Sequence, residues 1–288
     1  MKTVILTHMG SPETSADIPD YLKRIFTDRA MIPLPFQNIL GPLLAWLRIP
    51  ETRRRYQKIG GGSPLPAITR SLAEKLSKEL GPDGIRVEAR YTHAHPLLKG
   101  DEEAVAIFPL YPSESMGLKF IRQRMPRARI LQDWYNFGGI LSCYRDRIKK
   151  ALTEVKIGKA TLLFLAHGLP LKSDGAEFYR QKVVVMQRSL AAFFPQIPSV
   201  LGFMGKAGPG KWLEPDAQAL IKSMDKDQSL VAIYLSLPAD NLEVSYDIDI
   251  ELREIAEKAG VAGFYRAPLL NDDDDFVQAI AQIIRRGL

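Results

Sequence analysis

Residues 159–170, KATLLFLAHGLP, contain the element that most clearly indicates the fold. Residues 161–166 form a short, continuously apolar run, which is typical of a strand buried on both faces of a parallel sheet. Gly168 and Pro170 then prevent the chain from continuing regularly, so we expect the strand to end beside His167. Because a similar strand, turn, helix and strand pattern opens the chain at Val4, this stretch marks the start of a second, similar α/β unit.

Other apolar runs lie on both sides of this strand, at residues 4–7, 85–91, 104–110, 199–204, 230–235 and 263–265. Segments with helical periodicity separate them, at residues 18–27, 66–80, 139–155, 175–193, 215–224 and 241–258. This alternation predicts an α/β fold of two similar Rossmann-like domains, with parallel sheets flanked by helices. We place the two domains at residues 1–137 and 138–270, and we expect a C-terminal helix at 271–288 to pack back on the first domain.

The composition is that of a soluble globular protein, because 46% of the 288 residues are hydrophobic and 25% are charged. The net charge of +6 fits an anionic ligand, an acidic membrane surface or nucleic acid. Nucleic acid is the weakest of the three, since the sequence has no basic stripe interleaved with aromatic residues. The single cysteine, Cys143, excludes an internal disulfide, a Cys-only zinc site and a protein-ligated iron–sulfur cluster. No apolar run is long enough to span a bilayer and no apolar leader opens the chain, so we expect a cytoplasmic protein.

Residues 31–50, MIPLPFQNILGPLLAWLRIP, stand apart because they combine several prolines with many large apolar side chains. Proline removes a backbone donor, so we expect no long continuous helix here. The composition is nevertheless too apolar for an ordinary exposed loop. Two interpretations are about equally open. One is a buried irregular connection or short core helix, and the other is a hydrophobic lip that contacts an apolar ligand or the inner face of a membrane.

Ligands of open α/β sheets bind beyond the carboxyl ends of the strands, so residues that follow the apolar runs are the first candidates for a site. These residues are His8, Met9, Tyr91, Tyr111, His167 and 238–241. A lone histidine after a strand is more often structural than catalytic. His167 is the stronger candidate, because Gly168 and Pro170 present its imidazole on a turn, where it can act as an uncharged base near neutral pH.

Glu243, Asp247 and Glu251 stand at i, i+4 and i+8 in the segment NLEVSYDIDIE, on one face of a predicted helix. Like charges at this spacing repel each other, which destabilises the helix and raises the proton affinity of the first carboxylate, Glu243. From spacing alone, a solvated acidic face is the favoured interpretation. The alternative is a carboxylate ladder that passes protons or guides a cation. Apolar Leu242 and Ile248 favour it weakly, since they do not fit an exposed face.

Three further motifs have plainer explanations. His93 and His95 have an i, i+2 spacing that could bind a metal, but no third ligand is near them in the sequence. Residues 60–64, GGGSP, lack the lysine of a phosphate-binding loop, so we interpret them as a turn into a helix capped by Ser63. The acidic run 272–275 places negative charge at the start of the last helix, where it is favourable.

Several segments, taken together and in order, resemble the ferrochelatase family along nearly the whole chain. The opening MGSPET with DIPDYLKRIFTD resembles the family's first loop and helix, and residues 34–38 with RRRYQKIGGGSPL resemble its proline-rich lip and glycine–serine–proline turn. Residues 166–170 resemble the strand-end motif with the catalytic histidine, and GPGKWLEPD resembles the Pro-Trp-Leu motif. NLEVSYDIDIE and LLNDDDDF are similar to the acidic helix and to the C-terminal motif.

The resemblance implies a chelatase-like enzyme, a lyase of haem biosynthesis that inserts Fe²⁺ into protoporphyrin IX. His167 would accept the pyrrole N–H protons, and Glu243 would face it across the metal. Asp247 and Glu251 would extend a path for protons or metal to the surface. Fe²⁺ would be a substrate, no cofactor or iron–sulfur cluster would be bound permanently, and the chain would be a monomer that touches a membrane through residues 31–50 and does not bind nucleic acid.

The porphyrin contacts that the resemblance implies come from five residues: Met9, Tyr111, Arg122, Pro238 and Asn241. Methionine at position 9 is similar to the protoporphyrin-using branch of the family. Two features differ from the family pattern. Asn241 stands where many members have histidine, and the Ser/Thr/Gly-rich loop that follows Tyr111-Pro112 in the family is missing. These differences leave open a chelatase for coproporphyrin or another tetrapyrrole, and a non-catalytic porphyrin or haem carrier of the same fold.

Overall fold

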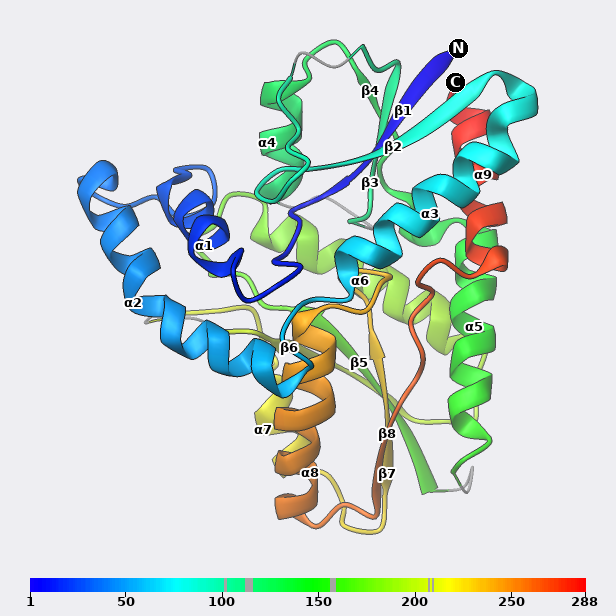
Figure 1. The fold of residues 1–288 in the computed structure, drawn as a ribbon. Coiled ribbons are helices and arrows are strands. Elements are labelled where there is room, and N and C mark those ends of the chain that lie inside the picture. The colour runs from blue at the N-terminus through cyan, green and yellow to red at the C-terminus, as the bar shows by residue number, and fades with distance from the viewer. Residues whose placement is uncertain (101–102, 112–115, 156–158, 207, 209) are drawn as a thin grey trace.

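The computed structural model describes residues 1–100, 103–111, 116–155, 159–206, 208 and 210–288. Within these ranges the chain forms two four-stranded sheets, one in each half of the sequence, and helices flank both (Figure 1). Residues 112–115, where the Ser/Thr/Gly-rich loop is missing, lie outside the described residues.

All strand pairings are parallel, and the two sheets repeat one topology. The first sheet has the order β2-β1-β3-β4, with strands β1 (Lys2–His8), β2 (Ile85–Tyr91), β3 (Ala106–Pro109) and β4 (Arg129–Ile130). The second has the order β6-β5-β7-β8, with strands β5 (Ala160–His167), β6 (Ser199–Met204), β7 (Ser229–Tyr234) and β8 (Gly263–Arg266). This repeat confirms the predicted α/β fold of two similar halves, and only the two-residue strand β4 lies outside the predicted runs.

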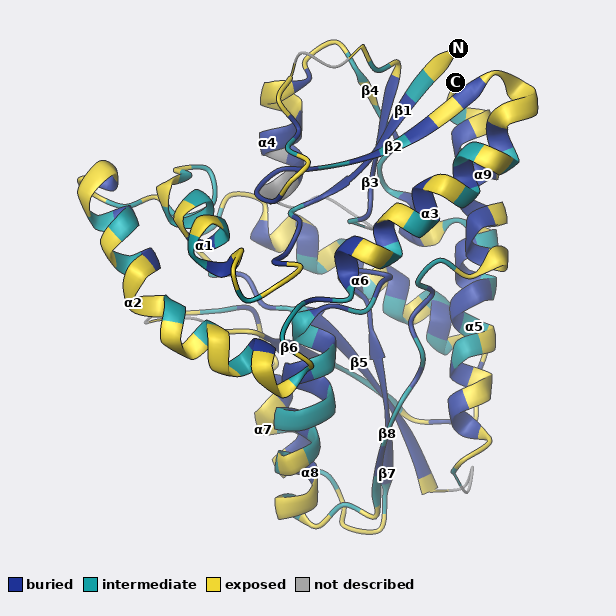
Figure 2. Ribbon diagram, in the orientation of Figure 1, coloured by how far each residue is buried: buried dark blue, intermediate teal, exposed yellow. Residues whose placement is uncertain are grey.

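Burial explains why the central strands read as continuous apolar runs. β7 is buried along its whole length, and β5 is buried from Ala160 to Ala166, since helices cover both faces of the sheet (Figure 2). Only His167, the last residue of β5, is partly exposed. The apolar pattern therefore stops where the strand reaches the edge of the core.

The helices of the first half are α1 (Ile18–Thr27), α2 (Gln37–Lys58), α3 (Leu65–Leu80) and α4 (Met116–Arg124). Those that follow are α5 (Gly138–Leu152), α6 (Ala176–Ala191), α7 (Ala217–Lys222), η4 (Glu243–Leu252), α8 (Arg253–Ala259) and α9 (Asp274–Gly287). The last helix, α9, lies beside α3 and α5 (Figure 1). Ion pairs join it to α3, from Lys75 to Asp274 and from Arg285 to Glu79. The prediction that the C-terminal helix packs back on the first half is confirmed.

The prediction that residues 31–50 form no long continuous helix is wrong. Helix α2 runs unbroken for 22 residues with Pro42 and Pro50 inside it. Each proline leaves a backbone carbonyl one turn earlier without its helical donor. Much of the helix surface is exposed, so water can satisfy those carbonyls (Figure 2). Gly41 lets α2 approach α1 closely, because a Cβ at this residue would lie 2.6 Å from the Phe26 carbonyl oxygen.

The helix predicted at residues 241–258 consists of two kinds of helix. Its first part, η4, is a π-helix of 10 residues, and it continues directly into the α-helix α8. A π-helix closes i→i+5 hydrogen bonds, and this rare form is frequent at functional sites. Within the described ranges, no helix combines the length and the apolar character that a membrane-spanning segment requires.

Candidate active site

His167 ends β5 and stands at the carboxyl edge of the second sheet. Its backbone N–H donates to Ser236 Oγ (2.7 Å), just beyond the end of β7. Gly205 lies against the imidazole, because a Cβ at that residue would come within 2.9 Å of His167 Nδ1. The side chain of His167 is 38% exposed, so the ring is supported from behind and open on one side.

Glu243, the first residue of η4, meets His167 at this edge. Its Oε1 lies 2.9 Å from His167 Nδ1, which is an ion-pair distance, although the two atoms are not aligned as a hydrogen bond. Its other oxygen, Oε2, accepts a hydrogen bond from the Tyr234 hydroxyl. The backbone N–H of Glu243 donates to Asn241 Oδ1 (2.9 Å). Both the main chain and the carboxylate of Glu243 are therefore fixed.

The pairing stabilises the charged form of both groups. The Glu243 charge outweighs burial and raises the pKa of His167 above its ordinary value. Burial alone would raise the pKa of Glu243, but His167, the Tyr234 hydroxyl and Arg55 together hold that pKa below its ordinary value. The expectation that the acidic stripe raises the proton affinity of Glu243 is therefore wrong. Its closest partners are a base and a hydrogen-bond donor rather than another carboxylate.

Asp247 and Glu251 follow Glu243 along η4 and share one cation, Arg55 of α2. Arg55 Nη2 lies 2.9 Å from Asp247 Oδ1 and 3.4 Å from Glu251 Oε2, and the guanidinium also covers the ring of Tyr246. Burial raises the pKa of Asp247 to about 7, against the opposing effect of Arg55. The interpretation of a solvated face is wrong for Asp247, which is buried. Glu251 reaches the rim, with 39% of its side chain exposed.

Five tyrosines from different parts of the fold interact electrostatically with the Glu243 carboxylate: Tyr21, Tyr56, Tyr111, Tyr179 and Tyr234. One of them, Tyr234, is also hydrogen bonded to it. Burial raises the pKa of each phenol, and the Glu243 charge raises it further. All five hydroxyls therefore stay protonated near neutral pH and can act as neutral hydrogen-bond donors. The site is thus a charged pair that remains partly open to solvent and is influenced by several neutral phenols.

Four of the predicted porphyrin contacts lie near the edges of the two sheets. Met9 follows β1 and its backbone is hydrogen bonded to the Tyr111 hydroxyl, so these two come together. Pro238 and Asn241 are buried beyond the end of β7. The Asn241 side chain contacts the backbone on both sides, since Oδ1 accepts the N–H of Glu243 and Nδ2 donates to the Ala239 carbonyl oxygen. Their roles toward a porphyrin stay predictions.

The fifth predicted contact, Arg122, lies on the exposed side of α4, where its guanidinium donates to Gln132 Oε1 (2.6 Å). Its contact with a porphyrin stays a prediction.

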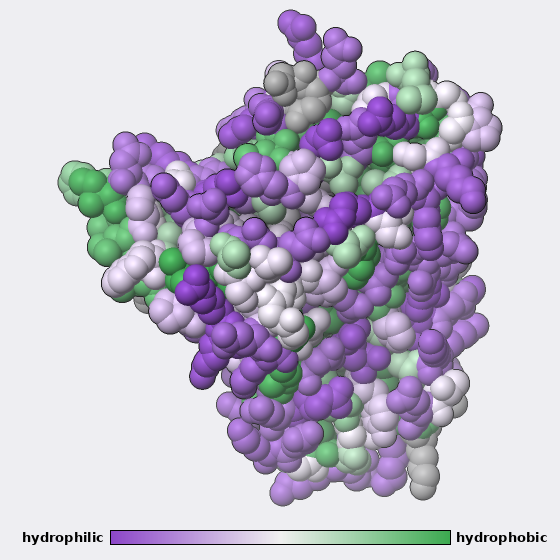
Figure 3. Space-filling model, in the orientation of Figure 1, coloured by the Kyte–Doolittle hydropathy of each residue, from purple (hydrophilic) through white to green (hydrophobic). Residues whose placement is uncertain are grey.

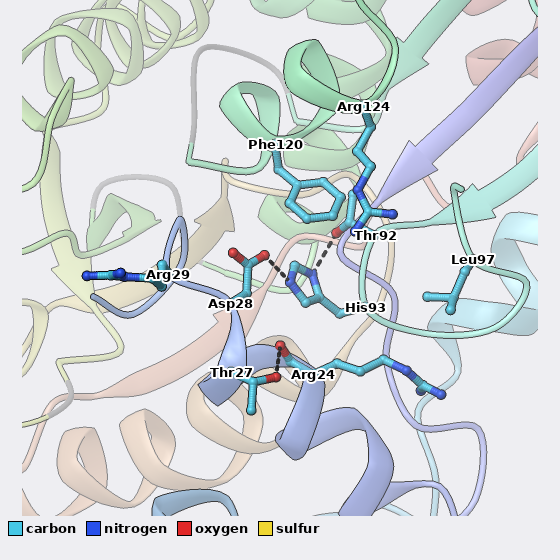
Figure 4. Close-up of a pocket in the computed structure, with 9 residues that line it drawn as sticks. All are labelled: Arg24, Thr27, Asp28, Arg29, Thr92, His93, Leu97, Phe120 and Arg124. Carbon is cyan, nitrogen blue, oxygen red and sulfur yellow. Dashed lines mark hydrogen bonds and ion pairs between the residues drawn. The ribbon is translucent and has the colours of Figure 1, made fainter. Parts of the chain in front are cut away.

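His93 and His95 do not share a metal site. His93 Nε2 lies 2.9 Å from Asp28 Oδ2, and its Nδ1 is hydrogen bonded to Thr92 Oγ1 (Figure 4). His95 is hydrogen bonded to Arg24 instead. Across the described residues, no group of three or more His, Cys, Asp or Glu side chains is arranged to hold a metal ion. A cavity of about 430 Å³ beside His93 is lined by Arg24, Thr27, Asp28, Arg29, Thr92, His93, Leu97, Phe120 and Arg124, and so does not include the His167–Glu243 pair.

Sequence reasoning missed several residues of the site. Tyr234 and Ser236 lie at the end of an apolar run, and their hydroxyl groups were only a weak indication that they belong to a site. Arg55 belongs to the basic run 53–55, but nothing in that run indicates which arginine faces η4. Gly205 could be recognised only from its contact with the imidazole.

A family model for ferrochelatase matches residues 1–288. The ferrochelatase of Thermosynechococcus vestitus is 31% identical over 99% of this chain and 82% of its own length, and that of Gloeobacter violaceus is 30% identical over 99% and 97%. Among solved structures, CbiX, the terminal enzyme of sirohaem biosynthesis in denitrifying bacteria, aligns over all of both chains with a TM-score of 0.60 at 16% identity. That likeness shows the fold alone. The full-length match to the family model and the relatives at about 30% identity show that this chain belongs to the ferrochelatase family.

Proposed function

We propose that this chain inserts Fe²⁺ into protoporphyrin IX, with His167 as the base for the pyrrole protons and Glu243 facing it at the insertion site. Membership of the ferrochelatase family makes the chain an enzyme of haem synthesis that inserts iron into a porphyrin. The observation that supports these residue roles is the separation of 2.9 Å between His167 Nδ1 and Glu243 Oε1 at the edge of the second sheet. A base beside a carboxylate suits the reaction, because a porphyrin loses two protons when its nitrogens bind a divalent cation.

His167 accepts a pyrrole proton in its neutral form, and the imidazolium so formed is stabilised by the carboxylate of Glu243. The raised pKa of His167 makes the neutral ring a stronger base. The imidazolium then passes its proton to Glu243, and from Glu243 the proton moves to Asp247, whose pKa of about 7 allows it to accept and release a proton near neutral pH. Glu251 at the rim then returns the proton to solvent, and His167 is ready for the second pyrrole proton.

Fe²⁺ is the second substrate in this proposal, and no cofactor is permanently bound. Imidazole and carboxylate groups without a thiolate hold a divalent ion loosely enough to release it to the porphyrin nitrogens. Met9 and Tyr111, which contact each other, support the macrocycle on the side of the first sheet. Binding energy from the rest of the ring supplies the out-of-plane bending that metal capture requires.

The apolar end of α2 supports a further part of the proposal, contact with a membrane surface. Phe36, Ile39, Trp46 and Leu47 each expose more than half of their surface. Figure 3 shows hydrophobic side chains gathered at this projecting end of the molecule. A contiguous exposed apolar patch marks an interaction site, and protoporphyrin is itself apolar. We propose that the patch rests on the membrane from which the substrate arrives.

Anaerobic incubation of the purified chain with Fe²⁺ and protoporphyrin IX tests the proposal through the absorbance change from porphyrin to haem. We expect turnover, no detectable turnover in His167→Ala, and a decrease of at least ~100-fold in Glu243→Gln, which is the lower range for loss of an acid–base group. Coproporphyrin measured in parallel decides between the two porphyrins. A wild-type chain that binds protoporphyrin tightly and never metallates it is a carrier, and this result would refute the proposed reaction.

A further inference from the structure

We infer that Tyr234 is a positioning residue of the insertion site, which holds the Glu243 carboxylate against His167. The inference rests on the proposed function, because it assigns a partner to the proposed catalytic pair. Tyr234 acts through Glu243, to which its hydroxyl donates a hydrogen bond. It is one of the five phenols that interact electrostatically with this carboxylate.

The register of the second sheet brings these groups to one face. Tyr234 pairs with Leu165 in neighbouring strands, and the Leu235 N–H continues the ladder by donating to the Leu165 carbonyl oxygen (2.9 Å). Two residues further along, Ser236 therefore stands beside His167. Side chains two residues apart point to the same side of a strand. Tyr234, Ser236 and His167 consequently share one side of the sheet.

Ser236 connects the two members of the pair. Its Oγ accepts the backbone N–H of His167 (2.7 Å), is hydrogen bonded to the Tyr179 hydroxyl (2.9 Å) and interacts with the Tyr234 phenol. The Tyr234 hydroxyl in turn holds Glu243. Both tyrosines expose less than a tenth of their surface, so water does not compete for these hydrogen bonds. The end of β7 thus fixes the histidine backbone and the glutamate side chain at the same time.

Tyr234 differs from the other four phenols in its contact with the carboxylate. Among the described residues, the Tyr234 hydroxyl is the phenol that donates a hydrogen bond to the Glu243 carboxylate. The other four phenols interact with the charge of Glu243 without a hydrogen bond to it. The last torsion of a glutamate side chain is broad, so a carboxylate with a single partner can turn about it. With Oε2 held by Tyr234, Oε1 is the oxygen that faces His167 Nδ1. Burial and the adjacent charge raise the phenol pKa well above its ordinary value, so Tyr234 is a fixed donor and not a relay.

The first test is turnover in Tyr234→Phe, which removes only the hydroxyl. We expect kcat to fall roughly tenfold, the effect of losing one hydrogen bond to a charged group, while the Kd for protoporphyrin changes less than about twofold. The matched control is Tyr144→Phe in α5, a buried phenol whose hydroxyl has no hydrogen-bond partner within the described part of the chain. This control should leave both quantities unchanged.

The second test needs no turnover and decides the inference. The chain has four histidines, so the His167 signals in a nitrogen-correlated NMR spectrum can be assigned with His167→Ala. In Tyr234→Phe the released carboxylate turns away from Nδ1, and the pKa of His167 should fall toward its ordinary value; in Tyr144→Phe it should stay. A pKa of His167 that is unchanged or higher in Tyr234→Phe overturns the inference. Absence of turnover in the wild type refutes the proposed reaction alone, because the titration still reports whether Tyr234 positions Glu243.

Discussion

Replacing Asp247 with asparagine should change the pH dependence of folding stability in a defined direction. Burial raises the pKa of Asp247 to about 7 from an ordinary value of 3.8, and only 12% of its side chain is exposed. A carboxyl group whose pKa is higher in the folded chain than in the unfolded chain opposes folding once the pH exceeds its pKa in the unfolded chain. The reason is that the unfolded chain releases the proton more easily. The penalty is absent below about pH 4, grows between pH 4 and 7, and is complete above pH 7.

The magnitude follows from the size of the shift. A difference of about three pKa units corresponds to about 4 kcal/mol, at about 1.4 kcal/mol per unit. Asparagine has nearly the same shape and no charge, so Asp247→Asn does not carry this penalty. The free energy of unfolding of the variant minus that of the wild type should therefore rise by about 4 kcal/mol between pH 4 and pH 8. Titrating groups that do not interact with Asp247 cancel in this difference.

Urea unfolding followed by tryptophan fluorescence, repeated at several pH values from 4 to 8, measures the difference. Asp275→Asn provides a control with a different pH profile. Burial there is outweighed by Arg147, which lowers the pKa of Asp275, so the stability that Asp275 contributes is already present above its unfolded pKa of 3.8. The stability difference for this variant should therefore stay nearly constant between about pH 5 and pH 8. A stability difference for Asp247→Asn that stays flat, or falls, between pH 4 and pH 8 would refute the reasoning.

Three further predictions concern the imidazole, the glycine beside it and the apolar end of α2. The rate constant kcat/KM should rise with pH, because only the neutral ring of His167 accepts a proton, and the midpoint of the rise should lie above the ordinary histidine pKa. In Glu243→Gln the raising charge is gone, so the pH profile of this variant should show the rise at lower pH than that of the wild type. Gly205→Ala should lower kcat ~10- to 100-fold, because its Cβ would press on His167 Nδ1 and its φ of +79° strains alanine; steady-state kinetics beside a melting curve separate displacement from unfolding. Trp46→Gln combined with Leu47→Gln should weaken cosedimentation with anionic liposomes, and binding equal to that of the wild type would contradict the membrane contact.

Much of the fold could be predicted because strands in the core appear as short apolar runs in the sequence. Strands β2 and β6 begin and end where the runs 85–91 and 199–204 do, although these outer strands are only partly buried. Helix α2 could not be predicted in the same way. Proline is a local argument against a helix, but Gln37 holds the start of α2 by donating to the Phe26 and Ile32 carbonyl oxygens. Those contacts depend on tertiary structure.

The site shows the same division between local and long-range information. The position of His167 follows from an apolar run and the turn after it, both within ten residues. The contact of Glu243 with His167 joins residues 76 positions apart, and only the family resemblance indicated it. Tyr234 and Ser236 depend on the register between β5 and β7, and Arg55 depends on how α2 crosses η4. Hydropathy patterns carry neither kind of information.

Asn241, where the family resemblance leads us to expect a histidine, is held by hydrogen bonds to the backbone at the start of η4. Its amide faces the backbone: Oδ1 accepts the N–H of Glu243, and Nδ2 donates to the Ala239 carbonyl oxygen. A second imidazole would add a base and a charge that depends on pH, whereas Asn241, Tyr234 and Ser236 are neutral groups. The Tyr234 hydroxyl fixes the direction of the Glu243 carboxylate, and Asn241 and Ser236 fix the backbones of Glu243 and His167, without competing for the proton that His167 must accept. The site therefore obtains orientation from hydrogen bonds and confines titration to His167, Glu243 and the carboxyl groups that follow along η4.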